Sequence, residues 1–229
     1  MLLQQARWSV VEACRALRHE RLVVGTAGNV SVRDGDLVAM SPSGVDYDAL
    51  TPELVGVHDL AGEPVEAPLA PSSELPLHLL VYARTAARVV VHTHAVASTA
   101  LSLVADELPA AHYYVALFGG PVRVAPYARF GTPELAAQVA AALDGRTAAL
   151  MAHHGAVVLG GSVGEALDRA RYLEYLCDVQ LRALATGRPV PTLPAAELDA
   201  VARALAAYGP GSGAASGPAS GGPPGAARG

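Results

Sequence analysis

The chain contains no lysine, and its sixteen permanently charged basic residues are all arginines. Lysine supplies the amine of an enzyme-bound Schiff base, so its absence excludes mechanisms that activate a carbonyl through a lysine imine. The arginines form no basic block and the formal net charge is −5, so we expect no nucleic-acid partner. The 229 residues are 52% hydrophobic, which predicts one globular domain with a sizeable core.

Cysteine is scarce and long apolar runs are missing. The two cysteines, Cys14 and Cys177, fall in separate predicted helices, and the N-terminus does not look like a signal peptide. We therefore expect reduced, partly buried thiols in a cytoplasmic protein. No apolar run approaches the roughly 18 residues that a membrane span needs, so we expect no membrane partner.

Hydrophobic periodicity predicts helices that alternate with short strands. Helices are expected near residues 2–20, 73–84, 95–104, 132–143, 163–186 and 195–208. We expect a serine of "PSSE" to cap the helix at 73–84, Thr132 to cap the helix at 132–143, and Ser162 to cap the helix at 163–186. Strands are expected at 30–33, 37–40, 88–92 and 122–125, and on both sides of a break at 153–155. This alternation predicts an α/β domain with one central sheet.

Two histidines end the most apolar of these strands. In "RVVVHTH", His92 and His94 are separated by one residue, so their side chains share one face. Such a pair suits a divalent metal, although a strand end whose histidines contact only water or carboxylates would look the same. Further along, "HHG" adds His153 and His154. One of these would complete a three-histidine site typical of catalytic zinc, unless both lie in a solvated turn.

Three polar turns interrupt the packing pattern: "GTAGNVSVR", "SPSG" and "PSSE". Each brings hydroxyls, an amide or free backbone N–H groups to a turn or a helix start. Such groups can bind a phosphate in a protein with few cations. Each segment taken alone is more typical of an ordinary turn or helix cap.

Taken in order from about residue 5 to Gly209, the motifs "GNVSVR", "SPSG", "PSSELPLH", "HTH", "APYARFGTPEL" and "HHGAVV" resemble the class II aldolase/adducin head family. The resemblance implies a single α/β domain over residues 1–208, with a central, largely antiparallel sheet flanked by helices. Residues 209–229 contain mainly glycine, proline, serine and alanine, so we expect a disordered tail.

The resemblance also implies the functional residues. It assigns one Zn²⁺ per subunit, or another divalent transition metal, to His92, His94 and His154, with His153 only a neighbour. Glu74 would be the catalytic acid/base and would reach the metal in the empty enzyme. The phosphate would be bound by residues of the three polar turns, namely Gly28, Asn29, Ser43, Gly44, Ser72 and Ser73.

Two tyrosines complete the implied site. Tyr113 would come from a neighbouring subunit and donate to the substrate's C4 oxygen, with Tyr114 beside it as the alternative. Tyr208 would close over the site. The implied assembly is a homotetramer with active sites at subunit interfaces.

The implied reaction is reversible cleavage of a phosphorylated ketose, L-fuculose 1-phosphate or a related 5-deoxypentulose 1-phosphate. The products would be dihydroxyacetone phosphate and a small aldehyde such as L-lactaldehyde, formed through a metal-stabilised enediolate. Glu74 would move the protons, and we expect a dry pocket to raise its pKa when no metal holds it.

Other members of the family leave alternatives open. Ribulose-phosphate 4-epimerases usually carry aspartate at the position of Glu74, and methylthioribulose-1-phosphate dehydratases differ around the acid/base. A non-catalytic head like that of adducin is expected to lose the metal histidines, which this chain keeps. The residues therefore favour an aldolase.

Overall fold

The protein is described for residues 1–207 by a computed structural model, so Tyr208 and the expected tail at 209–229 lie outside the described residues. The helices are α1 (Gln4–His19), α2 (Leu75–Arg84), α3 (Val96–Ser102), α4 (Pro133–Ala142), α5 (Val163–Leu184) and α6 (Ala195–Ala207), with a 3₁₀ helix at Tyr113–Phe118. The strands are β1 (Asn29–Asp34), β2 (Leu37–Met40), β3 (Gly56–Asp59), β4 (Pro64–Glu66), β5 (Val89–Thr93), β6 (Glu107–Leu108), β7 (Val122–Ala125), β8 (Ala148–Met151) and β9 (Gly155–Gly160).

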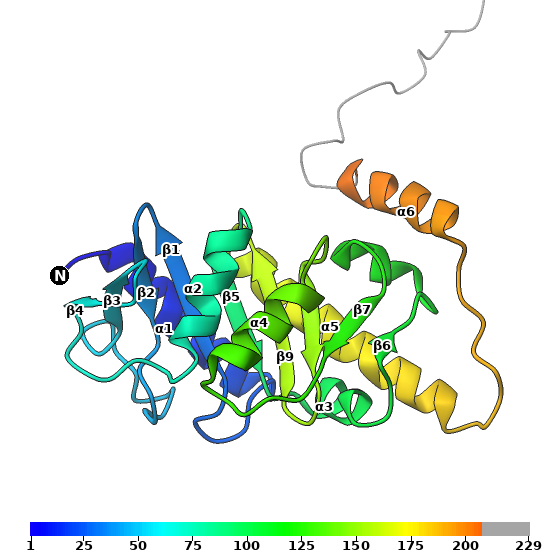
Figure 1. Ribbon diagram of the computed structural model, residues 1–229, viewed down its shortest axis with the longest axis horizontal. Coiled ribbons are helices and arrows are strands. Elements are labelled where there is room, and N and C mark those ends of the chain that lie inside the picture. The colour runs from blue at the N-terminus through cyan, green and yellow to red at the C-terminus, as the bar shows by residue number, and fades with distance from the viewer. Residues whose placement is uncertain (208–229) are drawn as a thin grey trace, which may run out of the picture.

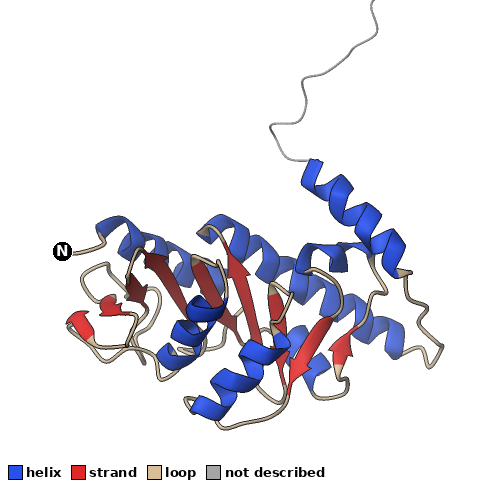
Figure 2. Ribbon diagram, turned by 45° about the horizontal axis from the view of Figure 1, so that its top comes forward, coloured by secondary structure: helices blue, strands red, loops and turns tan. Residues whose placement is uncertain are grey.

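One sheet forms the centre of the molecule, with strand order β4-β3-β2-β1-β5-β9-β8-β7-β6. Each neighbouring pair is antiparallel except β7 and β8, which run parallel. Helices cover both faces: α2 and α4 lie on one side, and α1, α3 and α5 on the other (Figures 1 and 2). The expected α/β domain with a largely antiparallel central sheet is confirmed.

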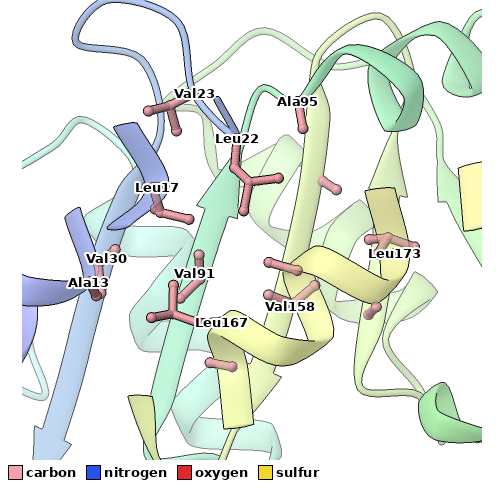
Figure 3. Packing of buried hydrophobic residues seen from close by; sticks show 14 of the residues in the cluster. Ala13, Leu17, Leu22, Val23, Val30, Val91, Ala95, Val158, Leu167 and Leu173 are labelled. Atoms are coloured by element: carbon pink, nitrogen blue, oxygen red, sulfur yellow. The ribbon is translucent and has the colours of Figure 1, made fainter. Parts of the chain in front are cut away.

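Strand β5 lies in the middle of the sheet and is buried along its whole length. Its valines alternate between the faces: Val91 packs toward α1 and α5, whereas Val90 packs toward α2 and α4. Figure 3 shows Val91 between Val30 and Val158 of the neighbouring strands, with Leu17 of α1 and Leu167 of α5 in the same apolar cluster. This packing fixes the position of the end of β5, which contains His92 and leads directly into His94.

The helix caps were predicted with mixed success. Thr132 and Ser162 cap α4 and α5 as expected, because each hydroxyl accepts a backbone N–H three residues ahead. The prediction of a serine cap for α2 is wrong. Glu74 holds the cap position without a capping hydrogen bond from its side chain, which is directed to other partners.

Strands β3, β4 and β6 and the 3₁₀ helix were not predicted. They are short, and two of the three strands lie at the sheet's edges, where a strand needs little apolar periodicity. Within residues 1–207, no helix is long and apolar enough to cross a membrane.

Candidate metal centre and active site

Three histidines meet where β5 ends beside the start of β9. His92 is in β5, His94 follows that strand, and His154 lies in the turn that connects β8 to β9. Because β5 and β9 are antiparallel neighbours, Thr93 pairs with Ala156, and the end of β5 lies beside the start of β9. The three ligand nitrogens lie within 4.8 Å of one another, and His92 Nε2 is 2.8 Å from His94 Nε2.

The turn before β9 is shaped so that His154 can approach β5. A Cβ atom on Gly155 would lie 2.1 Å from the carbonyl oxygen of Thr93, so only glycine permits this close contact. His153 adopts a left-handed conformation with φ 58°, and the His154 N–H donates to the carbonyl of Met151. His153 therefore lines the pocket from a different direction and does not join the histidine cluster.

Two of the three imidazoles, those of His94 and His154, are held in the neutral form that a metal ligand requires. Burial, and then the neighbouring His92 and His154, lower the pKa of His94 to about 4. Burial followed by His92 also lowers the pKa of His154. His92 Nδ1 lies 2.9 Å from the carbonyl oxygen of Ala156, which can only accept, so Nδ1 carries a proton and Nε2 is the nitrogen that faces the cluster. These three residues fit a divalent metal.

Glu74 lies beside the cluster and is almost completely buried. Its Oε2 accepts a hydrogen bond from Asn29 Nδ2 at 2.9 Å and is 3.2 Å from His92 Nε2, while Oε1 is 3.6 Å from His154 Nε2. Burial alone would raise the pKa of Glu74, but His92, Asn29 and His154 together lower it below its ordinary value. The expected rise is therefore wrong for this arrangement: the carboxyl is ionised at neutral pH.

The three polar turns converge next to this cluster. They line a single pocket of about 360 Å³ together with His94, His154 and Glu74, and every residue assigned to phosphate binding is part of its wall: Gly28, Asn29, Ser43, Gly44, Ser72 and Ser73. No arginine is among the lining residues that the structure describes. An anion in this pocket would be bound by hydroxyls, an amide, backbone N–H groups and a metal, if one is present.

Hydrogen bonds join the three turns into one unit. Asn29 Nδ2 donates to Ser72 Oγ at 3.0 Å as well as to Glu74, and the Ser72 N–H donates to the carbonyl of Ser41. The buried Tyr47 donates its hydroxyl to the carbonyl oxygen of Gly28 at 2.7 Å. The pocket wall is thus a connected structure built from segments that are far apart in the sequence.

Part of the pocket wall comes from a loop that was not predicted residue by residue. Tyr127 and Phe130 line the pocket from this loop, which precedes α4, and are about two-thirds exposed, at 65% and 66%. His153 lies near Tyr127, with ring centroids 6.0 Å apart. The sequence signal was an aromatic pair in a loop bounded by Pro126 and Gly131, which we used only as part of a family motif.

Tyr113 does not reach the pocket of its own chain. It begins the 3₁₀ helix, is 42% exposed and stacks on His112 with ring centroids 4.7 Å apart. Tyr114 is next to it, at 4.3 Å between centroids. The structure therefore brings together the expected histidines, the carboxylate and the phosphate-binding residues, but leaves Tyr113 on the surface and Tyr208 outside the described residues.

Comparison with known proteins agrees with this geometry. Residues 9–181 match the family described as class II aldolase and adducin N-terminal domain. The chain is 40% identical over 202 residues to the L-fuculose phosphate aldolase of Escherichia coli strain K12, covering 87% of this chain and 94% of that protein. It is 35% identical over 212 residues to the 5-deoxy-D-ribulose 1-phosphate aldolase of Bacillus thuringiensis, covering 91% and 99%.

A solved structure of an L-fuculose 1-phosphate aldolase superposes with a TM-score of 0.86 at 33% sequence identity, covering 90% of this chain and 98% of that chain. The family match, the sequence identities and the structural superposition thus agree on one family. The chain therefore belongs to the class II aldolase and adducin N-terminal domain family, and to the aldolases within it.

Proposed function

We propose that the protein is a zinc-dependent aldolase that reversibly cleaves a ketose 1-phosphate to dihydroxyacetone phosphate and a small aldehyde. The observation that carries this proposal is the pocket itself, in which three imidazoles and a buried carboxylate stand next to a set of neutral phosphate-binding groups. The substrate would be L-fuculose 1-phosphate, giving L-lactaldehyde, or a related 5-deoxypentulose 1-phosphate.

His92, His94 and His154 would hold the zinc, or another divalent transition metal, and Glu74 is close enough to His92 and His154 to reach it in the empty enzyme. When bound, the metal would supply a Lewis acid next to the substrate carbonyl. The carbonyl of Ala156 would keep the His92 ring oriented, because its hydrogen bond fixes the position of Nδ1.

Glu74 would move the proton of the reaction. Cleavage breaks the bond between C3 and C4, the C4 hydroxyl loses its proton, and C3 of the triose fragment gains one. A carboxylate whose pKa is lowered is ionised at neutral pH, so it can accept a proton and return it. Asn29 would hold the carboxylate in place through its hydrogen bond to Oε2.

Different groups of the pocket wall would recognise the two ends of the substrate. Ser43, Ser72 and Ser73 would bind the 1-phosphate, and the exposed rings of Tyr127 and Phe130 would face the part that becomes the aldehyde. An apolar wall suits a methyl or larger apolar group at C5. In line with this, a relative from Rhodospirillum rubrum, 39% identical, is named as a 5-methylthioribulose-1-phosphate/5-deoxyribulose-1-phosphate aldolase.

We further propose a cytoplasmic homotetramer with Tyr113 of one subunit completing the pocket of the next. The exposure of Tyr113 away from its own pocket supports this assembly, and the two free, buried cysteines support a reducing compartment. In such an assembly Tyr113 would donate to the C4 oxygen.

The reaction can be measured directly. Dihydroxyacetone phosphate released from L-fuculose 1-phosphate or from 5-deoxyribulose 1-phosphate is reduced by a coupling dehydrogenase, and the loss of NADH is followed with and without a zinc chelator. We expect cleavage that the chelator stops and zinc restores. Zinc-loaded protein that releases no triose phosphate from either substrate would instead favour an epimerase or a dehydratase, and the same samples can be assayed for those products.

A further inference from the structure

The carboxylate of Glu174 caps a helix to which it does not belong. Glu174 lies in the middle of α5, and its Oε1 accepts the backbone N–H of Ala97 at 2.6 Å while its Oε2 accepts that of Ser98 at 2.8 Å. Both amides lie in the first turn of α3, more than 70 positions earlier in the chain. Glu174 does not line the pocket, and the chemistry proposed above does not use it.

Helix α3 has no cap of its own. Ala95 holds the cap position without a side-chain hydrogen bond, and its methyl group is buried in the apolar cluster that contains Leu22 and Leu173 (Figure 3). The first N–H groups of a helix have no partner within the helix, and leaving them without one costs stability when water is excluded. Glu174 binds two of them with one charged side chain, at the end of the helix dipole that favours negative charge.

The start of α3 follows His94 directly, with only Ala95 between the histidine and the first helical residue. The backbone of His94 is itself held by two other segments. Its N–H donates to the carbonyl of Leu22 at 3.1 Å, and a Cβ on Gly155 would lie 3.4 Å from its Cα. Glu174 then fixes the chain three and four residues further on, so His94 lies between two fixed points.

The His94 ring depends on its backbone more than the His92 ring does. His92 is oriented by the hydrogen bond between its Nδ1 and the carbonyl of Ala156. Within residues 1–207, the His94 ring has no hydrogen-bond partner outside the histidine cluster, because its one such contact is with His92 Nε2. The direction of the His94 imidazole is therefore set by the course of the chain on either side of it.

We propose that Glu174 is a positioning residue for the metal site. By capping α3 from α5, it holds the chain after His94 so that this imidazole converges with those of His92 and His154 before a metal binds. Without the cap, the first turn of α3 would fray and His94 would adopt orientations that do not meet its partners. This inference rests on the metal site proposed above, whereas the cap itself does not.

Glu174→Gln tests the cap with almost no change of shape. The amide keeps one accepting oxygen, but its NH₂ group would face the second backbone N–H, donor against donor. We expect the dissociation constant for Zn²⁺, measured by competition with a chelator, to rise about 10-fold or more. Co²⁺ serves as a spectroscopic probe, because its visible absorption depends on ligand geometry, and we expect the absorption bands of the Co²⁺-loaded variant to differ from those of the wild type.

Glu165→Gln is the matched control. Glu165 is on the same helix, and its Oε2 also accepts a backbone N–H, that of Gly161 at 2.6 Å. Gly161 follows the end of β9 that is remote from His154, so this variant removes the same charge and a similar hydrogen bond away from the histidines. We expect its zinc affinity and Co²⁺ absorption to match the wild type. Equal effects in the two variants would overturn the inference, because they would show only a general contribution of α5 to stability.

A second measurement needs no variant. If the cap raises zinc affinity, zinc must strengthen the cap by the same free energy, so adding Zn²⁺ to the wild type should slow hydrogen exchange at the Ala97 and Ser98 amides. Exchange that zinc leaves unchanged would overturn the inference even if Glu174→Gln does not fold.

The two proposals fail in different ways. A folded wild type that binds no zinc would overturn the proposed metal site together with this inference. A wild type that binds zinc, with the same affinity in Glu174→Gln, would overturn the role of Glu174 and leave the proposed function standing.

Discussion

His92, His94 and His154 show how neighbours set the chemistry of a residue. Three imidazoles whose ligand nitrogens lie within 4.8 Å of one another repel each other when charged, and burial adds to the cost of protonation. The low pKa values of His94 and His154 leave lone pairs for a metal at neutral pH. The single buried carboxylate beside them, Glu74, would offset part of the charge that a metal brings.

Low pKa values of buried histidines predict a loss of stability in mild acid. The pKa of His78 is about 3 in the folded chain and about 6.5 when unfolded, so as the pH falls below 6.5 the unfolded chain takes up the proton first. Stability is therefore complete above pH 6.5 and falls as the pH drops toward 3. At pH 5 we expect a loss of up to about 2 kcal/mol from this residue alone.

Urea unfolding of metal-free protein at pH 7.5 and at pH 5.0 measures this effect. The wild type should lose more stability between the two pH values than His78→Gln, which has no group that titrates there. An equal loss in both proteins would mean that His78 is not the source.

Gly155 is the residue at which the backbone tolerates no side chain. We expect Gly155→Ala to destabilise the fold by about 3 kcal/mol or more and to displace His154, because the added Cβ would meet the Thr93 carbonyl at 2.1 Å. Gly164→Ala is the control: this glycine lies in the first turn of α5 with nothing within 4 Å, so alanine should be neutral or stabilise slightly. Thermal unfolding and bound zinc would be measured for both, and similar stability in the two variants would contradict the prediction.

At the level of elements, the pocket depends on contacts between loops more than on any one helix. Tyr47 shows this most clearly, since its buried hydroxyl connects the segment after β2 to Gly28 at the start of β1. Gly28 itself has φ 81°, and a Cβ there would lie 2.6 Å from Val23 Cγ1. The backbone of the phosphate-binding wall is therefore held from two sides.

Tyr47→Phe should weaken phosphate binding and leave the chemical step nearly intact. Removing the hydroxyl frees the Gly28 carbonyl, at a cost of about 1–2 kcal/mol in stability, and loosens the wall. We expect KM for the ketose phosphate to rise several-fold with kcat within about twofold. Tyr175→Phe, on an exposed ring of α5, should change neither value. A fall in kcat with KM unchanged in Tyr47→Phe would contradict this role.

Elements with a strong local signal could be predicted from the sequence. The apolar stripe of α1, the valines of β5 and the hydroxyl caps at Thr132 and Ser162 each specify their structure within a few residues. Glu74 could not be placed in this way. Its side chain leaves the helix start for Asn29 and His92, which are 45 and 18 positions away, so the serine cap suggested by "PSSE" does not form.

The candidate site was predicted where residue type alone restricts the chemistry. The pair His92 and His94 and the three polar turns could be singled out from residue type and spacing, whereas the choice of His154 and of the individual phosphate-binding residues came only from the family resemblance. Tyr127 and Phe130 were not singled out, because an exposed aromatic residue has no local pattern that separates a role from packing. Their positions follow only from the order of strands in the sheet.

For the whole molecule, the candidate site lies where the central strands β5 and β9 meet, while a cluster of tyrosines lies on another surface. Tyr113, Tyr172 and Tyr175 are exposed there, and Tyr113 lies outside its own pocket. If Tyr113 acts in the pocket of a neighbouring subunit, an inactive Tyr113→Phe chain and an inactive Glu74→Gln chain should complement each other.

Coexpression of these two variants in equal amounts should restore activity to about a quarter of the wild-type value, since a complete site needs Glu74 from one chain and Tyr113 from the other. Each variant expressed alone is the control. Mixed oligomers no more active than the better single variant would mean that the tyrosine does not act across subunits.

The most direct single measurement is release of dihydroxyacetone phosphate by the zinc-loaded wild type and by Glu74→Gln, with bound zinc determined in the same samples. If the pocket is an aldolase site, the wild type releases the triose phosphate and Glu74→Gln, still holding zinc, is slower by at least about 100-fold. Zinc-loaded wild type that releases none, or Glu74→Gln that releases it at the wild-type rate, would contradict the proposed function.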